Sequence, residues 1–294
     1  MLKRFDHAVI GVRSLEAAIA LWRGSLGLDA QAGGRHTGRG TYNAIVRFGL
    51  DYIELISIYD RSEIETRGEA NALALAGLLD GSEGGMLGFA LASDDIEADG
   101  RRLRQAGLAV DGPTPMERLR PDGRLLRWRL LVPRGGSWGT PFPFIIQWDD
   151  ADEQRLSWER PGAHAIGAVA VAALAITVAE LHPWVEVYSR QLGLELVSRD
   201  ASDELGASQA RFRVGTTYLD LLAPLGPGLV ADAVAHGEQP WQITLRVRDL
   251  AAASRELLQH GIETRRAPGV PEGLLIPPEL AIGARLVLVD GAAN

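Results

Sequence analysis

The strongest constraint on the fold is that the chain repeats itself. One ungapped offset of 166 residues, from Gly27 to Gly193, aligns residues 9–56 with a stretch of the second half. It pairs like with like at many separate positions, namely Arg47 with Arg213, Gly49 with Gly215, Tyr52 with Tyr218, Glu54 with Asp220 and Leu55 with Leu221. An offset that holds over so many positions indicates an internal duplication, so the two halves should form similar units.

Each half also contains a second, related unit. Residues 88–108 and 242–262 both show a strand-like run followed by a helix-like run, with an offset of 154 residues. The sequence therefore divides into four modules near residues 1–60, 85–150, 165–224 and 238–294, each with a strand followed by a helix. The helices are expected to begin at Ser14, Ser93, Glu180 and Asp249, and Ser or Asp side chains there can accept hydrogen bonds from the first turn.

Alternating apolar residues predict further strands. They cover Thr41–Phe48, Tyr52–Ile58, Leu125–Val132 and Phe142–Trp148, and a helix is predicted over Ala70–Leu79. An acidic stretch that ends in Pro161 and Gly162 separates the halves. We therefore expect a first unit at residues 1–150, a linker at 151–163 and a second unit at 164–294.

Composition excludes several classes of function. The formal net charge of −8 disfavours binding to nucleic-acid backbones. The chain has no cysteine, which excludes disulfides, thiolate metal sites and thiol nucleophiles. Charged residues begin at Lys3, so the N-terminus has no apolar signal-peptide core. The most apolar stretch, residues 163–178, is short for a membrane span. We expect a cytoplasmic protein that does not contact membranes.

Four successive strand–helix–strand–strand–strand modules resemble the vicinal-oxygen-chelate superfamily of glyoxalases, bleomycin resistance proteins and extradiol dioxygenases. The first half resembles its glyoxalase-like domain family, at residues 33–43 and at Phe5-Asp6-His7-Ala8-Val9, Tyr52-Ile53-Glu54-Leu55 and Pro143-Phe144-Ile145-Ile146-Gln147-Trp148. The resemblance is specific over residues 1–150 and extends only to the fold beyond them. It implies an α+β fold in which four tandem βαβββ modules form two cupped mixed β-sheets with helices outside.

The resemblance also implies a divalent metal ion inside the first cup. The matching positions are His7 on the first strand and Glu54 on the fourth, while Gln147 on the last strand of the second module offers a weaker amide oxygen. These nitrogen and oxygen ligands suit Fe, Mn, Ni, Co or Zn. Glu54 is also the candidate catalytic residue, because its carboxylate could move a proton. Gly88 stands where the second module would carry its own histidine, so this ligand set departs from the family pattern.

Strand alternation bears on the same two residues. Since each second residue of a strand turns inward, His7 should share its face with Phe5 and Val9, and Glu54 should share its face with Tyr52 and Ile56. Taken singly, His7 also fits a hydrogen-bonded sheet histidine and Glu54 a strand-edge charge. The metal site therefore requires that both side chains enter one cup.

The glycine-rich segment 33–43 is the candidate substrate-binding region. Its glycines let a ligand approach the backbone closely, and His36, Arg39 and Asn43 supply hydrogen-bond donors. A solvated hairpin loop fits the composition equally well, although Asn43 should point into the cup.

The remaining candidates have simpler interpretations. Arg127 and Arg129 are expected to face solvent on either side of a core Trp128, and Trp138 and Trp148 could belong to the core or line a pocket. In the second half, Asp220 stands at the Glu54 position but Ala173 stands at the His7 position. The second half is therefore expected to be a degenerate copy that shapes the fold.

Two functions follow. The first is a divalent-metal-dependent lyase, isomerase or dioxygenase acting on a small oxygen-rich molecule. The second is a metal-free protein that sequesters a small molecule, which the short ligand set favours. Both predict a small-molecule partner, and both leave a homodimer possible.

Overall fold

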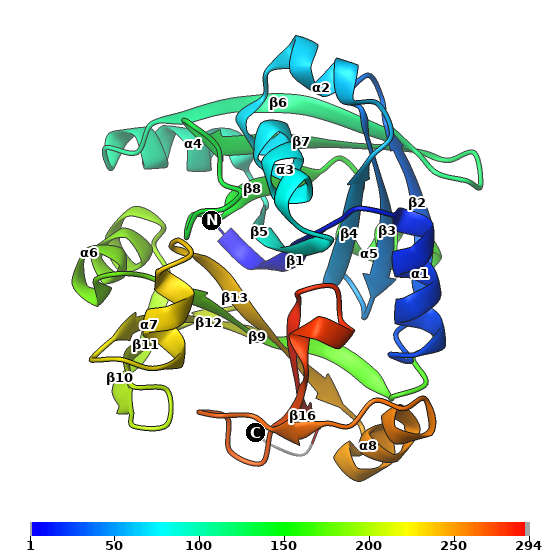
Figure 1. Cartoon of the computed structure of the whole chain (residues 1–294). Coiled ribbons are helices and arrows are strands. Elements are labelled where there is room, and N and C mark those ends of the chain that lie inside the picture. Colours follow the sequence, from blue (N-terminus) through cyan, green and yellow to red (C-terminus); the bar gives the residue numbers. More distant parts are fainter. Residues whose placement is uncertain (1, 292–294) are drawn as a thin grey trace.

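The first half of the chain closes into an eight-stranded barrel, in a computed structural model that describes residues 2–291 (Figure 1). The strand order is β1-β4-β3-β2-β6-β7-β8-β5. The strands are β1 Leu2–Val12, β2 Ala30–His36, β3 Thr41–Arg47, β4 Tyr52–Ile58, β5 Gly84–Ser93, β6 Val110–Leu119, β7 Leu125–Pro133 and β8 Phe144–Trp148. A short pairing of β2 with β6, which sets His36 opposite Arg118, closes the first of the two expected cups.

The second half forms an open eight-stranded sheet in the order β10-β11-β12-β9-β13-β16-β15-β14. Its strands are β9 Ala168–Thr177, β10 Glu195–Ser202, β11 Ala207–Val214, β12 Thr217–Pro224, β13 Gln239–Val247, β14 Arg265–Arg266, β15 Leu274–Ile276 and β16 Arg285–Asp290. Strand β9 lies parallel to β12 with Ala173 opposite Tyr218, just as His7 of β1 lies opposite Tyr52 of β4. This matching register confirms the duplication inferred from the sequence.

Helices lie around both sheets (Figure 1), and one of them, Ala70–Gly81, packs Leu75 and Leu79 against cavity-side residues of the barrel rather than on its outside. They are α1 Leu15–Gly24, α2 Arg61–Arg67, α3 Ala70–Gly81, α4 Ile96–Gln105, α5 Asp152–Trp158, α6 Leu181–Glu186, α7 Leu229–Val234 and α8 Leu250–Gln259, with a π-helical turn at Val187–Gln191 and a 3-10 turn at Pro278–Leu280. Ser14 and Asp249 cap their helices as expected. The expected cap at Ser93 is wrong, because β5 continues to Ser93 and Asp95 accepts the capping hydrogen bond of α4 instead.

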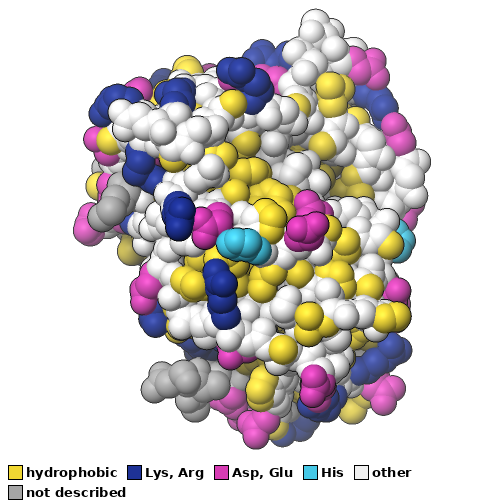
Figure 2. Space-filling view, turned by 90° about the vertical axis from the view of Figure 1, so that its left-hand side faces the viewer, with side chains coloured by type: hydrophobic (Ala, Val, Ile, Leu, Met, Phe, Trp, Pro, Cys, Tyr) yellow, Lys and Arg dark blue, Asp and Glu magenta, His cyan; other side chains and the backbone are white. Residues whose placement is uncertain are grey.

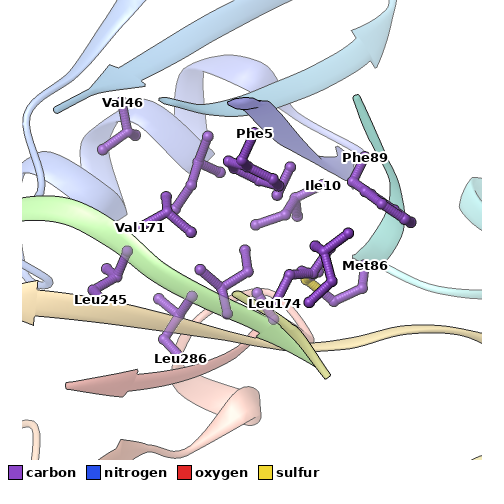
Figure 3. Close-up of a cluster of buried hydrophobic side chains, with 14 of the residues drawn as sticks. Phe5, Ile10, Val46, Met86, Phe89, Val171, Leu174, Leu245 and Leu286 are labelled. Carbon is purple, nitrogen blue, oxygen red and sulfur yellow. The ribbon is translucent and has the colours of Figure 1, made fainter. Parts of the chain in front are cut away.

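The two halves share one hydrophobic core. Figure 3 shows side chains from the outer face of the barrel, among them Phe5 and Phe89, pointing toward Leu174 and Leu286 of the second sheet. Burying this apolar surface from water is the main force that holds the halves together. The same seam reaches the surface, where hydrophobic side chains gather across the middle of the face seen in Figure 2.

None of the helices within residues 2–291 combines the length and the apolar character that crossing a membrane requires.

Candidate functional site

The barrel encloses a cavity of about 330 Å³. Five aromatic rings line it, namely those of Tyr52, Trp128, Trp138, Phe144 and Trp148, together with aliphatic side chains such as Ile56, Met116, Leu130, Val132 and Ile146. Its polar lining includes His7, His36, Glu54 and Arg118. The cavity therefore combines an apolar wall with a few polar groups, as small-molecule sites commonly do.

His7 enters this cavity because β1 contains a β-bulge. The pairing of β1 with β5 steps from Phe5 opposite Leu91 to His7 opposite Ala90, which leaves Asp6 as the extra residue. The expected alternation of Phe5 with His7 is therefore wrong. Phe5 packs in the core between the halves, whereas His7 lines the cavity.

The bulge also brings Asp6 and His7 into contact. Asp6 Oδ1 lies 2.8 Å from His7 Nδ1, and Asp6 Oδ2 accepts hydrogen bonds from Arg4 at 2.8 Å and from the Trp148 indole at 3.2 Å. Burial by itself would raise the pKa of Asp6, but the charges of Arg4 and Arg155 and the hydrogen bond with His7 hold that pKa well below its usual range. An ionised carboxylate only accepts, so His7 Nδ1 is the donor, and in the neutral tautomer of this ring Nε2 is the acceptor.

His7 Nε2 faces Glu54. His7 Nε2 lies 3.6 Å from Glu54 Oε2, beyond ordinary hydrogen-bond length, and the His7 ring stacks on Tyr52 at 4.5 Å. Asn43 donates a hydrogen bond to the other oxygen, Glu54 Oε1. Asn43 reaches this position because residue 33 is glycine: a Cβ there would lie 2.2 Å from Asn43 Oδ1. Asn43 thus restrains Glu54 through this hydrogen bond but does not itself line the cavity.

His36 and Arg39 both line the cavity, as the sequence predicted for the binding segment. His36 Nε2 lies 3.8 Å from Glu54 Oε1, and His36 Nδ1 lies 2.9 Å from Thr41 Oγ1. Burial lowers the pKa of His36 to about 4, so this imidazole is neutral at neutral pH. Arg39 forms an ion pair with Glu69, just before α3. The charge of Arg39 is thus already matched by a carboxylate.

Gln147 lies outside this site. Its Oε1 accepts hydrogen bonds from the Ile96 backbone at 2.9 Å and from Arg129 at 3.1 Å, and its Nε2 donates to Asp94 at 2.8 Å. On β8 it is the neighbours Ile146 and Trp148 that line the cavity, so alternation turns Gln147 to the other face. The structure therefore does not bring Gln147 to His7 and Glu54, contrary to its expected role as a ligand.

The indole of Trp138 lies directly against Gly88. A Cβ on Gly88 would lie 2.4 Å from Trp138 Cδ1. The position where the second module lacks a histidine is thus packed against an aromatic ring. Trp128, Trp138 and Trp148 all line the cavity, Trp128 is buried in a hydrophobic cluster as expected, and Arg127 is exposed as expected.

Helix α5, inside the segment expected to be a linker, supplies charges that sequence reasoning missed. Arg155 is fully buried, lies 2.7 Å from Glu159 and stacks over the Trp148 ring at 4.0 Å. Glu159 also pairs with Arg47 at 2.7 Å. An acidic, proline-terminated stretch resembles a solvated linker, so its sequence carried no signal of this burial.

The donor atoms of His7 and Glu54 fit a divalent metal ion. Two atoms that each lie about 2.1 Å from one ion are roughly 3.0–3.4 Å apart, close to the observed 3.6 Å. The carboxylate behind His7 is the usual partner of a metal-binding imidazole. Within residues 2–291, no group of three or more His, Cys, Asp or Glu side chains is arranged to hold an ion. An ion held by His7 and Glu54 would therefore keep positions open for water or substrate oxygens.

The second half carries no comparable arrangement at the matching position. Asp220 accepts two hydrogen bonds from Arg211, at 2.7 and 2.8 Å. Both of its oxygens are thus engaged, whereas Glu54 Oε2 faces the cavity near His7.

Comparison with known proteins agrees with this architecture. Residues 5–190 match the glyoxalase-like domain. The chain belongs to the glyoxalase-like domain family. Residues 174–273 also match the glyoxalase/bleomycin resistance protein/dioxygenase superfamily, so both halves carry the superfamily signature. No curated protein matches the sequence.

Two solved structures are similar to this glyoxalase-like chain over nearly its whole length. A hypothetical protein from Staphylococcus aureus has a TM-score of 0.70 and 17% identity, with 97% of this chain and 98% of that chain covered. A variant of 4-hydroxymandelate synthase from Streptomyces coelicolor has a TM-score of 0.68 and 14% identity, with 99% and 93% covered. At these identities the likeness shows the fold, which is the two-unit fold of the superfamily.

Proposed function

We propose that this protein is a divalent-metal-dependent enzyme, of the lyase, isomerase or dioxygenase type, that acts on a small oxygen-containing molecule. The observation that carries the proposal is the 3.6 Å approach of His7 Nε2 to Glu54 Oε2 inside an apolar cavity. With Nδ1 bonded to Asp6, the neutral tautomer of His7 presents Nε2 as an acceptor toward the Glu54 carboxylate, and a cation bound between these two atoms would be attracted to both of them. Membership of the glyoxalase-like family supports the same conclusion.

The residues of the chain have separate parts in this proposal. His7 and Glu54 would hold the ion, which when bound supplies Lewis acidity toward a substrate oxygen. Asp6 fixes the tautomer and orientation of His7 through the hydrogen bond to Nδ1. Asn43 restrains Glu54 by donating to Oε1, so that Oε2 is the oxygen free to bind an ion or move a proton. His36, neutral and 3.8 Å from Oε1, is placed to hydrogen-bond a substrate oxygen.

The barrel wall contributes by excluding water and orienting the substrate. Tyr52, Trp128 and Phe144 surround the polar groups with apolar surface. Electrostatic interactions are stronger in such surroundings than in bulk water. A substrate held against these rings would present its oxygens to His7 and Glu54.

The decisive experiment is elemental analysis of protein purified without added metal and then equilibrated with Fe, Mn, Ni, Co or Zn. The wild type should retain an ion in stoichiometric amount, and His7→Ala and Glu54→Gln should lose it. Asp220→Asn is the matched control, because it changes the corresponding carboxylate of the second half, and it should retain the ion. Absence of retained metal, or equal retention in all variants, would refute the proposal.

A metal-free binding protein is the second candidate. It is favoured by the two-residue donor set and by the hydrogen bond that Asn43 already donates to Glu54. In this case the melting temperature would be insensitive to chelators. A bound metal instead adds about 2.7 kcal/mol at a concentration 100 times its dissociation constant, which chelation would remove.

A further inference from the structure

Among the described residues, Arg118 is a buried cation that forms no ion pair, although the charges of Glu54 and Glu159 act on it from a distance. It lies on β6, is 3% exposed and lines the cavity. Within residues 2–291 no hydrogen bond or ion pair joins its guanidinium to another group, and its Nε is buried without a partner. Burying an unpaired charge costs several kcal/mol, so a side chain of this kind calls for an explanation.

The other buried arginines near the cavity differ from Arg118 in this respect. Arg4 pairs with Asp6 at 2.8 Å, and Arg47 and Arg155 each pair with Glu159 at 2.7 Å. Asp6 and Glu159 are therefore each paired with other arginines. Glu54 is engaged by Asn43 and faces His7.

The position of Arg118 in the barrel directs it inward. It pairs in register with His36 across the β2–β6 junction, and directly opposed residues of paired strands point to the same face of the sheet. Since His36 lines the cavity, Arg118 reaches the same interior. A planar guanidinium presents two parallel N–H groups, which match the two oxygens of a carboxylate.

The rest of the cavity is suited to an aromatic body. Trp128 and Trp148 lie with ring centroids 5.2 Å apart, and Phe144, Trp138 and Tyr52 add further ring surface. Such rings contribute apolar contact and favourable stacking geometry toward a flat ligand. The cavity volume of about 330 Å³ suits a small molecule.

We propose that the ligand of this cavity is a small aromatic carboxylic acid whose carboxylate is bound by Arg118 while its ring packs against the tryptophans. The inference deepens the proposed function by naming a substrate class for the same site. It rests on the proposed function only in calling this ligand a substrate. Binding of the acid by Arg118 does not itself require a metal ion. A carboxylate is favoured over a phosphate because a single unpaired guanidinium matches one negative charge.

The test is calorimetric titration of chelator-treated, full-length protein with phenylacetate, with the neutral isostere phenylacetamide and with phenyl phosphate. Phenylacetate should bind about tenfold or more tightly than the amide, as expected for a hydrogen-bonded charge pair. Equal binding of acid and amide, or tighter binding of phenyl phosphate, would overturn the proposal whatever any variant does.

Substitutions of arginine test whether Arg118 is the group that binds the carboxylate. Arg118→Met should abolish the preference for the acid, whereas Arg118→Lys should keep it in weakened form. Arg127→Met removes an exposed arginine on the neighbouring strand and should leave the preference unchanged. Arg118→Met should also raise the melting temperature of the ligand-free protein by roughly 2–4 °C, because it removes an unmatched buried charge. A lowered melting temperature or failure to fold would show that Arg118 has a structural role and would contradict the proposal.

The same preparations separate the two proposals. Selective binding of phenylacetate together with an inability to retain metal would refute the metal-dependent enzyme and uphold the acid site. Stoichiometric metal retention without any preference for phenylacetate would do the opposite.

Discussion

Asp6 and His7 are consecutive residues of one strand, yet the carboxylate of Asp6 accepts a hydrogen bond from the imidazole of His7 at 2.8 Å. Neighbouring side chains of a regular strand point to opposite faces, so this contact depends on the bulge between Phe5 and His7. The bulge thereby fixes the ring orientation and the tautomer of the candidate metal ligand. A local irregularity of the backbone thus determines the chemistry of the site.

Neutralising Asp6 should destabilise the protein. Asp6→Asn keeps the shape of the side chain but leaves Arg4 and Arg155 without the charge between them, and the expected loss in free energy of unfolding is about 3 kcal/mol. Urea unfolding measures this loss. Asp152→Asn is the control, because Asp152 pairs with Lys3 and Arg4 at a partly exposed position, and its loss should stay below about 1 kcal/mol. Equal effects of the two changes would contradict the structure.

Adding a methyl group at Gly88 should disturb the aromatic wall of the cavity. Gly88→Ala forces the Trp138 ring to move, and overpacking of this kind costs about 1–3 kcal/mol. Tryptophan fluorescence should change together with the unfolding midpoint. Gly77→Ala, at an open position inside α3, should instead stabilise the protein by about 0.5–1 kcal/mol. If Gly88→Ala were as harmless as Gly77→Ala, the packing of Trp138 on this strand would be wrong.

His164 should make stability depend on pH. Its Nδ1 accepts a hydrogen bond from the Asp29 backbone at 3.0 Å, and its Nε2 lies 2.8 Å from the Arg47 carbonyl oxygen, so only the neutral ring satisfies both. Burial lowers the pKa of His164 below its ordinary value. The unfolded chain therefore binds a proton at a higher pH than the folded protein does, and the free energy of unfolding decreases as the pH falls below about 6.5 until the folded pKa is passed.

The measurement is urea unfolding of wild type and His164→Gln over a pH series. The variant should lack the part of the slope that belongs to His164, so the difference between the two proteins should shrink on acidification. A constant difference across the series would show that His164 titrates normally in the folded state.

Arg155 should matter although it lies in a segment that resembles a linker. Arg155→Met removes a fully buried cation next to Glu159 and Asp6, and we expect a loss of about 3 kcal/mol in unfolding free energy. Trp148, over which the guanidinium stacks, should change its fluorescence. Arg160→Met, an exposed change nearby, should stay within about 0.5 kcal/mol of wild type. Similar stabilities of the two variants would refute the burial of α5.

Most residues of the candidate site could be predicted from the sequence. His7, His36, Arg39 and Glu54 were expected near one cavity, and the structure places all four in its lining. Gln147 was expected in the same site, but its neighbours Ile146 and Trp148 line the cavity, so strand alternation turns Gln147 to the other face of β8. Arg118 was missed because a lone arginine on a strand usually points to solvent, and only the β2–β6 pairing shows that it points inward.

The duplicated architecture was predictable from the amino-acid order, because a constant offset between like residues and periodic apolar patterns are properties of the chain alone. The lack of cysteine likewise excluded thiol chemistry. How the barrel closes, where the bulge at Asp6 turns His7, and the burial of Arg155 by α5 follow from the folded arrangement. These features depend on contacts between residues far apart in the chain, such as the pairing of His36 with Arg118, and the energy of such contacts is set by the packed surroundings rather than by local sequence.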